Sequence, residues 1–116
     1  MKTLLIVLDT CRRDNLSCYG YSRKTSPNID KLAEKGVLFN NAYTCDVPTI
    51  PSFTAMLNGR LGIKTGVISF NSTEMIADEV QSLPFILARN GIVTAAVSTL
   101  FYMRSNLVKG FQHYMN

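Results

Sequence analysis

The sequence predicts an α/β protein in which a mostly parallel sheet is flanked by helices in layers. Two observations lead to this prediction: three segments carry the start and stop signals of helices, and short runs of branched apolar residues separate them. Helices that alternate with apolar strands are typical of parallel sheets, because each crossover needs room to return the chain. With 116 residues, 47% of them apolar and 17% charged, the chain corresponds to one packed domain.

The first part of the chain predicts a strand, a helix and a second strand. Residues 3–9, TLLIVLD, form a continuous apolar run, as expected of a strand buried on both faces. The helix follows in SPNIDKLAEKG, with Ser26 as its N-cap, Pro27 at its first position and Gly36 as its stop. Residues 37–43, VLFNNAY, then predict a second strand or extended segment.

The second part predicts two more helices and a strand. Residues 50–59, IPSFTAMLNG, have proline near the start of the helix and glycine after its end. Residues 61–75 lack a clear periodicity and predict a loop. The third helix occupies residues 82–91, SLPFILARNG, and the strand IVTAAVS follows at 92–98. After this strand the signals weaken until residues 109–116, KGFQHYMN.

Composition and charge exclude several classes of function. The net charge of +4 is mild and the Lys and Arg residues are scattered, so we expect no nucleic-acid partner. The apolar run Leu4–Leu8 is shorter than the roughly 7–15 residues of a secretory signal or the ~20 of a membrane span. Three cysteines without a CxxC pair, and a single histidine, His113, disfavour a disulfide framework or a zinc site. We therefore expect a cytoplasmic protein with no membrane contact.

One place for chemistry is the end of the first predicted strand. In open parallel sheets, functional groups gather at the carboxyl ends of strands, and Asp9 stands at this point. Such a carboxylate either caps a turn or binds a hard divalent cation. The chain has no DxDxT pattern and no glycine-rich phosphate or dinucleotide loop, which excludes the α/β enzymes that depend on those motifs.

A second place is CDVPTIPSFTAMLNGR, residues 45–60, where hydroxyl groups precede a helix. The start of a helix offers unpaired N–H groups and the positive end of the helix dipole, which suit a phosphate or sulfate oxyanion. A hydroxyl there is well placed to act as a nucleophile, although Ser and Thr at helix starts commonly serve only as caps. The candidate nucleophiles are Cys45, Thr49 and Ser52.

Five segments, in the order LLIVLDTCRRDNLSCYGY, SPNIDKLAEKGVLFNNAYT, PTIPSFTAMLNGR, SLPFILARNGIVTAAVS and KGFQHY, resemble the amino-terminal portion of the sulfatase family. This family lies within the alkaline-phosphatase-like superfamily, so the resemblance implies a partial alkaline-phosphatase-like layered fold. It extends from Leu4 to about Tyr114. It also implies that residues 1–116 are the amino-terminal part of a sulfatase-like catalytic domain, without its carboxyl-terminal metal-binding half. His113 corresponds to a structural position in that family.

The resemblance also identifies a nucleophile position. Sulfatases carry Cys or Ser two residues before a proline, ahead of a helix that ends in TGR, and this residue is converted to formylglycine. Aligned on Pro51 and on the NGR that ends at Arg60, the position is Thr49. Threonine cannot yield formylglycine and Phe53 replaces the motif arginine, so we expect no formylglycine. Threonine here is similar to the phosphodiesterase, phosphonate hydrolase and phosphoethanolamine-transferase branches, which favours phosphate over sulfate esters.

A metal site and a small ester substrate are implied in the full-length relatives. Asp9 maps onto a ligand of a divalent metal (Mn, Zn, Mg or Ca) that also binds Thr49. Arg12 maps onto an arginine with either a substrate-anion contact or a local structural role. The later ligands of the family, including an Asp-His-Gly-like motif, are not in these residues, so we expect weak metal binding and little or no turnover by this chain alone. The alternative is a non-catalytic module that self-associates or pairs with the missing carboxyl-terminal half.

Overall fold

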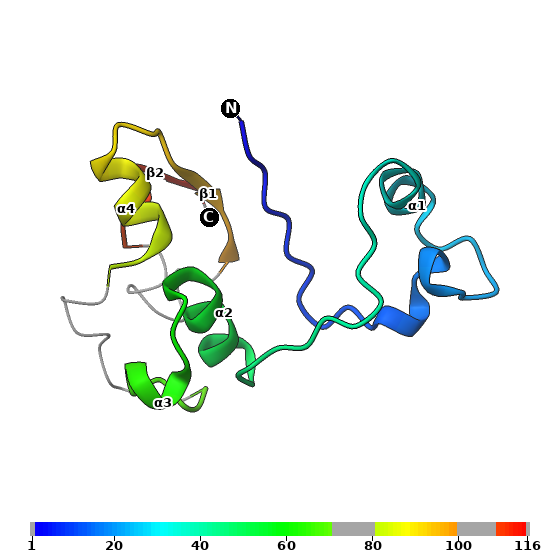
Figure 1. Cartoon of the computed structure of the whole chain (residues 1–116), viewed down its shortest axis with the longest axis horizontal. Coiled ribbons are helices and arrows are strands. Elements are labelled where there is room, and N and C mark those ends of the chain that lie inside the picture. The colour runs from blue at the N-terminus through cyan, green and yellow to red at the C-terminus, as the bar shows by residue number, and fades with distance from the viewer. Residues whose placement is uncertain (1, 71–80, 100–108, 116) are drawn as a thin grey trace. The chain divides into compact units, whose positions relative to one another are not determined.

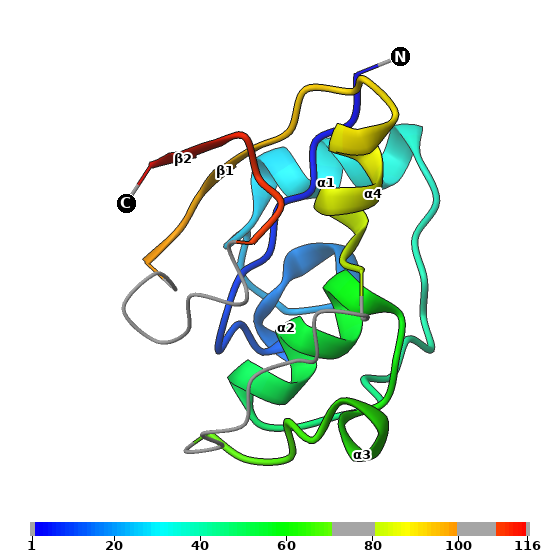
Figure 2. The same ribbon diagram turned by 90° about the vertical axis from the view of Figure 1, so that its left-hand side faces the viewer.

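The computed structural model describes residues 2–70, 81–99 and 109–115 of the chain (Figure 1). It contains short helices and a two-stranded parallel sheet (Figure 2). This combination confirms the predicted α/β class in the form of a partial fold. Within the described ranges, no helix is both long enough and apolar enough to cross a bilayer.

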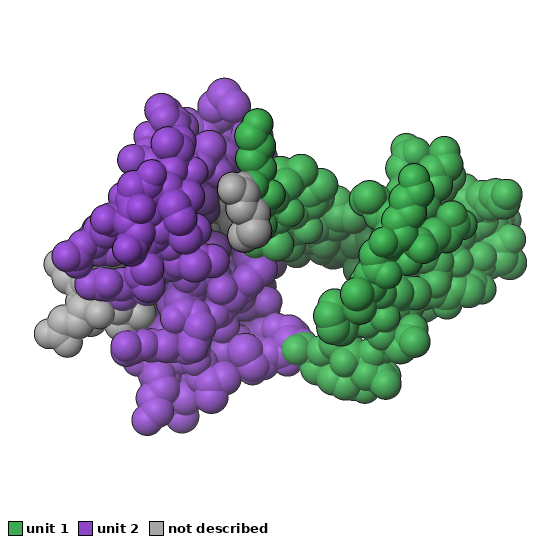
Figure 3. Space-filling view, turned by 45° about the horizontal axis from the view of Figure 1, so that its top comes forward, with its two compact units in different colours: residues 1–43 green, residues 44–116 purple. Residues whose placement is uncertain are grey.

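The chain divides into two compact units, Met1–Tyr43 and Thr44–Asn116 (Figure 3). The first unit contains two short 3-10 turns, η1 at Arg13–Asn15 and η2 at Ser17–Tyr19, and the helix α1 at Pro27–Lys35. α1 begins and ends where its proline and glycine signals predict, because those signals act on the local backbone.

The two strands predicted in the first unit are not formed there. Residues 3–9 and 37–43 are extended or irregular, and the apolar side chains Leu4–Leu8 are 43–84% exposed. A strand needs a neighbouring backbone to pair with its N–H and C=O groups, and no described residue of this unit provides one. The Phe39 carbonyl instead accepts a hydrogen bond from the Tyr19 hydroxyl at 2.9 Å. The strand predicted at residues 3–9 is therefore wrong, because an apolar branched run indicates propensity and not a partner. Of the two alternatives for residues 37–43, the strand is not formed.

A cluster of polar side chains joins η2 to α1. The Ser17 hydroxyl donates to Asp30 Oδ2 at 2.7 Å, and the Ser26 hydroxyl donates to Asp30 Oδ1 at 2.9 Å. Ser26 precedes α1 as predicted, but its side chain binds Asp30 instead of capping a backbone N–H. The hydrogen bond from Ser17, followed by the one from Ser26, holds the pKa of the Asp30 carboxyl below its ordinary value. Ser26 is the one buried side chain among the described residues of this unit, so polar contacts substitute for an apolar core.

Replacing Asp30 by asparagine is expected to destabilise the first unit at neutral pH. The folded-state pKa of Asp30 is lowered from 3.8, so its contribution is complete above 3.8 and is lost as the pH falls through the lowered value. Urea unfolding at a series of pH values measures the difference in the free energy of unfolding between the unaltered chain and the Asp30→Asn variant. Glu34→Gln, on the exposed surface of α1, is the control. A difference that stays constant toward low pH would contradict the prediction.

The described residues of the second unit form α2 at Thr49–Asn58, α3 at Gly62–Thr65, α4 at Leu83–Arg89, β1 at Ala95–Val97 and β2 at His113–Met115. α2 packs against both α3 and α4. Ile50 of α2 and Val67 are 1% and 4% exposed and pack together, and Phe53 and Leu57 border them. The core of this unit therefore lies along one face of α2.

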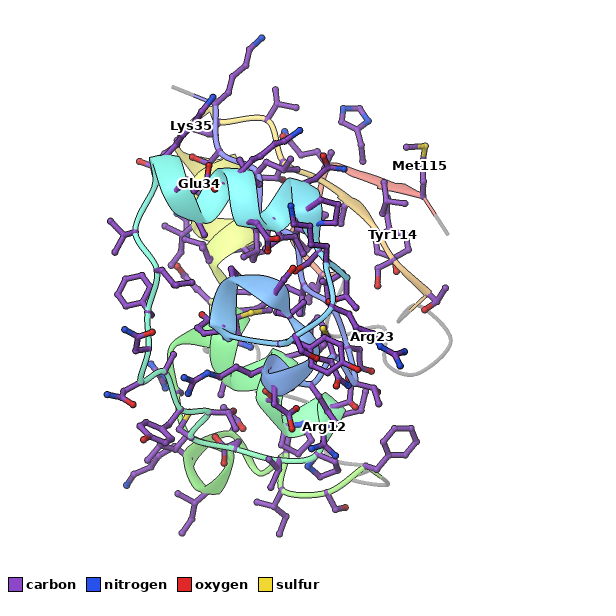
Figure 4. The ribbon with its side chains drawn as sticks, turned by 90° about the vertical axis from the view of Figure 1, so that its right-hand side faces the viewer. Arg12, Arg23, Glu34, Lys35, Tyr114 and Met115 are labelled. Carbon is purple, nitrogen blue, oxygen red and sulfur yellow. The ribbon has the colours of Figure 1, made fainter. Side chains whose placement is uncertain are left out.

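The sheet joins two segments that are distant in the chain. β1 and β2 lie side by side and run parallel, with Ala95 opposite His113. The Tyr114 hydroxyl donates to the Ser98 carbonyl at 2.6 Å. Met115, the next residue of β2, points to the other side of the strand (Figure 4). The alternation expected of a strand is thus present even in this short element.

Several predictions for the second unit can be compared with this arrangement. The helices predicted at 50–59 and 82–91 are confirmed. The strand predicted at 92–98 is confirmed only over Ala95–Val97, as β1. The predicted loop at 61–75 contains the one-turn helix α3, and its part beyond residue 70 lies outside the described residues. β2 was not predicted, because three residues carry too little periodicity to be read locally.

Hydrogen bonds to the segment before β2 explain why it forms. The Ser82 hydroxyl donates to the Lys109 carbonyl at 3.1 Å, and the Thr94 hydroxyl donates to the Gly110 carbonyl at 3.2 Å. The Thr94 N–H donates to Gln112 Oε1 at 3.1 Å. These contacts from the start of α4 and from the residue before β1 place β2 beside β1.

Candidate functional site

The predicted nucleophile lies at the start of α2. Thr49 is the first residue of this helix and Pro48 precedes it, so the threonine lies one position inside the helix instead of at its N-cap. Thr49 is half-buried. Ile50 and Pro51, which follow it, are fully buried and anchor this end of the helix in the core. Gly59 ends the helix in the left-handed region, with a φ of 62°.

The other two candidate nucleophiles have different surroundings. The hydroxyl oxygens of Ser52 and Thr44 are 3.2 Å apart. The Thr44 hydroxyl donates to the Asp46 carbonyl at 2.8 Å. This uses its one proton, so Ser52 is the donor to Thr44. Ser52 therefore serves the local structure, while Cys45 is an exposed free thiol on the loop before the helix.

Asp46, which the motif analysis did not select, is a structural part of this site. Its Oδ2 accepts a hydrogen bond from the N–H of Gly62 at 2.9 Å, across sixteen positions of sequence. One feature of the sequence could have drawn attention to Asp46. It is the only acidic residue between Glu34 and Glu74, and it lies three positions before Thr49. That signal does not indicate a partner, because the contact with Gly62 depends on the packing of α3 against α2.

Asp9, the predicted metal ligand, lies in an exposed turn of the first unit. Residues 2–8, which form neither helix nor strand and follow an extended course, precede it (Figure 1). Thr10 follows with a φ of 59°, a region that branched residues rarely adopt. Backbone strain of this kind persists where the surrounding structure enforces it, and functional sites are such places. The carboxylate thus follows an extended segment, as predicted, but that segment is not a strand in this unit.

Arg12, the predicted substrate contact, forms an ion pair with Asp14 on the surface. Its Nε donates to Asp14 Oδ1 at 2.9 Å, and a terminal nitrogen donates to Oδ2. The hydrogen bond and the charge of Asp14 raise the pKa of Arg12, and the hydrogen bond from Arg12 lowers the pKa of Asp14. Of the two roles considered for Arg12, this geometry supports local structure.

The two predicted metal ligands belong to different units, Asp9 to the first and Thr49 to the second. In the part of the chain that the structure describes, no three His, Cys, Asp or Glu side chains form a group that could hold a metal ion. Hard divalent ions take about six oxygen ligands or more. One carboxylate and one hydroxyl do not complete such a site, so the described residues alone do not fit a tightly held ion.

Comparison with known proteins agrees with the motif order. The model of the family described as Sulfatase matches residues 2–116. Iduronate 2-sulfatase of Homo sapiens is 36% identical over 103 residues, which cover 88% of this chain and 18% of that protein. N-acetylgalactosamine-6-sulfatase of Homo sapiens is 32% identical over 105 residues, which cover 81% of this chain and 20% of that protein. Arylsulfatase A of Homo sapiens is 34% identical over 95 residues, 78% of this chain and 19% of that protein. The chain spans about a fifth of the length of the curated relatives it matches.

Proposed function

This chain belongs to the sulfatase family, and we propose that it supplies the nucleophile of a metal-dependent hydrolase acting on phosphate or sulfate esters. The proposed nucleophile is Thr49. The observation that supports it is its place as the first residue of α2, directly before the buried pair Ile50 and Pro51. A hydroxyl at this point lies beside the N–H groups and the positive dipole end of the helix, which favour an ester oxyanion.

The proposed step transfers the phosphoryl or sulfuryl group of the ester to Thr49. A bond forms between Oγ and phosphorus or sulfur, the bond to the ester oxygen breaks, and the hydroxyl proton passes to the departing alcohol. Water then releases the group and restores the threonine. The N–H groups at the start of α2 hold the negative oxygens during both steps. This chemistry needs a hydroxyl and no formylglycine, so Thr49 acts unmodified.

Asp9 is the proposed metal ligand of this chain, with Mn, Zn, Mg and Ca as the metals considered. Because the described residues do not complete a metal site, the remaining oxygen donors of a working enzyme lie outside them. Arg12 reaches a substrate anion only by leaving Asp14, which makes it a secondary contact in this proposal.

Two observations bear on the ester class. The matched relatives are named sulfatases, which supports sulfate esters. The threonine at the nucleophile position and Phe53 in place of the motif arginine support phosphate esters. Hydrolysis of chromogenic phosphate and sulfate esters, with and without the Thr49 hydroxyl, tests the proposal and separates the two classes.

A second candidate function is that of a non-catalytic module that associates with itself or with a separate remainder of the domain. The observation that favours it is the run Leu4–Leu8, which is extended and exposed. In the described part of the first unit, no strand pairs with this run. An exposed extended apolar segment is a template for pairing with another chain.

Replacing Ile6 by lysine is expected to reduce such association, because a charge in the middle of the run opposes burial against another chain. Ile6 is 67% exposed, so the substitution leaves the unit itself intact. Sedimentation velocity over a range of concentrations measures the size of the species. Ile63→Lys, at a residue of α3 that is 79% exposed, is the matched control. A chain that is monomeric at every concentration would rule out self-association and leave only pairing with a separate remainder of the domain.

A further inference from the structure

The loop before the predicted nucleophile, residues 44–48, is held at its first and its middle residue by side-chain contacts within the second unit. At its beginning, Thr44 accepts a hydrogen bond from Ser52 in the first turn of α2. In its middle, Asp46 accepts a hydrogen bond from the N–H of Gly62 at the first position of α3. The loop that leads into Thr49 is therefore attached to two different helices.

The contact between Asp46 and Gly62 combines charge with a donor that α3 leaves unpaired. The first N–H groups of a helix have no partner within it, so the Gly62 N–H is available to a side chain. A carboxylate accepting from a backbone N–H forms a charge-assisted bond, which is roughly twice as strong as a neutral one. Asp46 is half-buried. Its bond ties the loop to a segment that lies beyond α2 in the chain.

Close packing at Gly62 shows that this contact leaves no room for a larger residue. A Cβ atom at this position would lie 2.6 Å from the Val67 carbonyl oxygen and 3.0 Å from Asp46 Oδ1. The turn from Gly62 to Val67 is closed by Thr65, whose hydroxyl donates to the Gly62 carbonyl at 3.2 Å. The segment that receives Asp46 is therefore a closed, densely packed turn.

The same turn also contacts the residue after the nucleophile. Val67 packs against Ile50, and the two side chains form the centre of the buried core. Ile50 follows Thr49 directly in α2. The turn thus holds the chain on both sides of Thr49: before it, through Asp46, and after it, through the core contact of Val67.

We propose that Asp46 is a positioning residue for Thr49. Its carboxylate fixes the loop 44–48 on Gly62, and the loop in turn sets the direction in which the Thr49 hydroxyl leaves the start of α2. Asp46 touches neither the ester nor the reacting atoms. This inference rests on the proposed role of Thr49 as nucleophile, but the contact itself can be tested without activity.

The experiment compares Asp46→Ala with Asp46→Asn in the protein as its gene encodes it. The asparagine side chain keeps an oxygen that can accept from the Gly62 N–H, whereas alanine does not. Asp46→Ala is expected to lower the kcat of ester hydrolysis by about tenfold to a hundredfold with a smaller change in KM, because misplacement acts on the reacting geometry. Asp46→Asn is expected to recover most of the loss. Glu34→Ala, on exposed α1, is the control with unchanged kinetics.

Amide hydrogen exchange supplies the second readout. Asp46→Ala is expected to speed exchange at Gly62 and at Thr49 and Ile50, while Asp46→Asn leaves these amides near their original rates. Equal kinetics for the two Asp46 variants, or unchanged exchange at these amides in Asp46→Ala, would overturn the inference. Hydrolysis that survives Thr49→Ala would instead overturn the proposed function, and the exchange result would still decide whether Asp46 holds the loop.

Discussion

Replacing Thr49 by alanine is expected to lower ester hydrolysis by at least about a thousandfold, because it removes the atom that receives the transferred group. Thr49→Ser keeps a hydroxyl at the first position of α2 and is expected to retain part of the activity. The measurement is alcohol release from chromogenic phosphate monoesters, phosphodiesters and sulfate esters, with Mn²⁺, Zn²⁺, Mg²⁺ or Ca²⁺ added. The protein is assayed as its gene encodes it.

Two matched variants test the other two candidate nucleophiles, the Ser52 hydroxyl and the Cys45 thiol. Ser52→Ala removes a hydroxyl from the same helical turn, where it donates to Thr44. Cys45→Ala removes an exposed thiol from the preceding loop. Neither variant is expected to abolish hydrolysis. Activity that depends on Cys45, or a formylglycine found at Cys45 by mass spectrometry of the peptide, would contradict the assignment of Thr49.

Failure to hydrolyse any ester is equally informative. A protein that is folded by circular dichroism, yet hydrolyses none of these esters with any of the metals, would contradict the proposed hydrolase and support the associating module. Thr49-dependent turnover by residues 1–116 alone would contradict the expectation that this chain is inactive without further ligands. A preference for phosphate esters over sulfate esters would support the reading of the threonine as a phosphoryl acceptor.

Gly110→Ala is expected to destabilise the second unit by about 3 kcal/mol, from the combined costs of backbone strain and overpacking. Gly110 has a φ of 101°, a conformation that residues with a Cβ avoid. A Cβ here would also lie 2.6 Å from the Phe85 nitrogen and 2.8 Å from its Cα. These are backbone atoms of α4, so the clash is relieved only by moving the helix away from the segment that leads into β2.

Gly91→Ala in the same unit is the control that separates strain from packing. Gly91 has a φ of 74°, but a Cβ added there would meet no atom within 4 Å beyond its neighbours in the chain. Its substitution is expected to cost only the left-handed backbone penalty of about 1–2 kcal/mol. Urea unfolding, followed through the amide signals of β1 and β2, measures both variants. Equal losses of stability would show that the close approach of Gly110 to Phe85 contributes nothing.

The helices illustrate what could be predicted from the sequence. Pro27 and Gly36 bound α1, and Gly59 ends α2 in the left-handed region, because proline and glycine act on the backbone of a few neighbouring residues. Thr49 was predicted differently: the residues alone left Cys45, Thr49 and Ser52 open, and the resemblance to the sulfatase motif selected Thr49. The proline and glycine signals need no distant partner, so they can be recognised before the fold is known.

The strands illustrate what could not be predicted. The run Leu4–Leu8 has a strong strand pattern, but no strand pairs with it among the described residues of its unit. The short β2 forms because it pairs with β1 and because Ser82 and Thr94 bind the segment before it. The hydrogen bond between Asp46 and Gly62 could not be predicted from the sequence either, because sixteen positions separate the two residues. Helix boundaries follow from local chemistry, whereas Thr49 as the nucleophile position was implied by the resemblance to the sulfatase family and stays a prediction. Strand pairing and the support of Thr49 were decided by tertiary structure, because backbone pairing and close packing depend on residues that are distant in the chain.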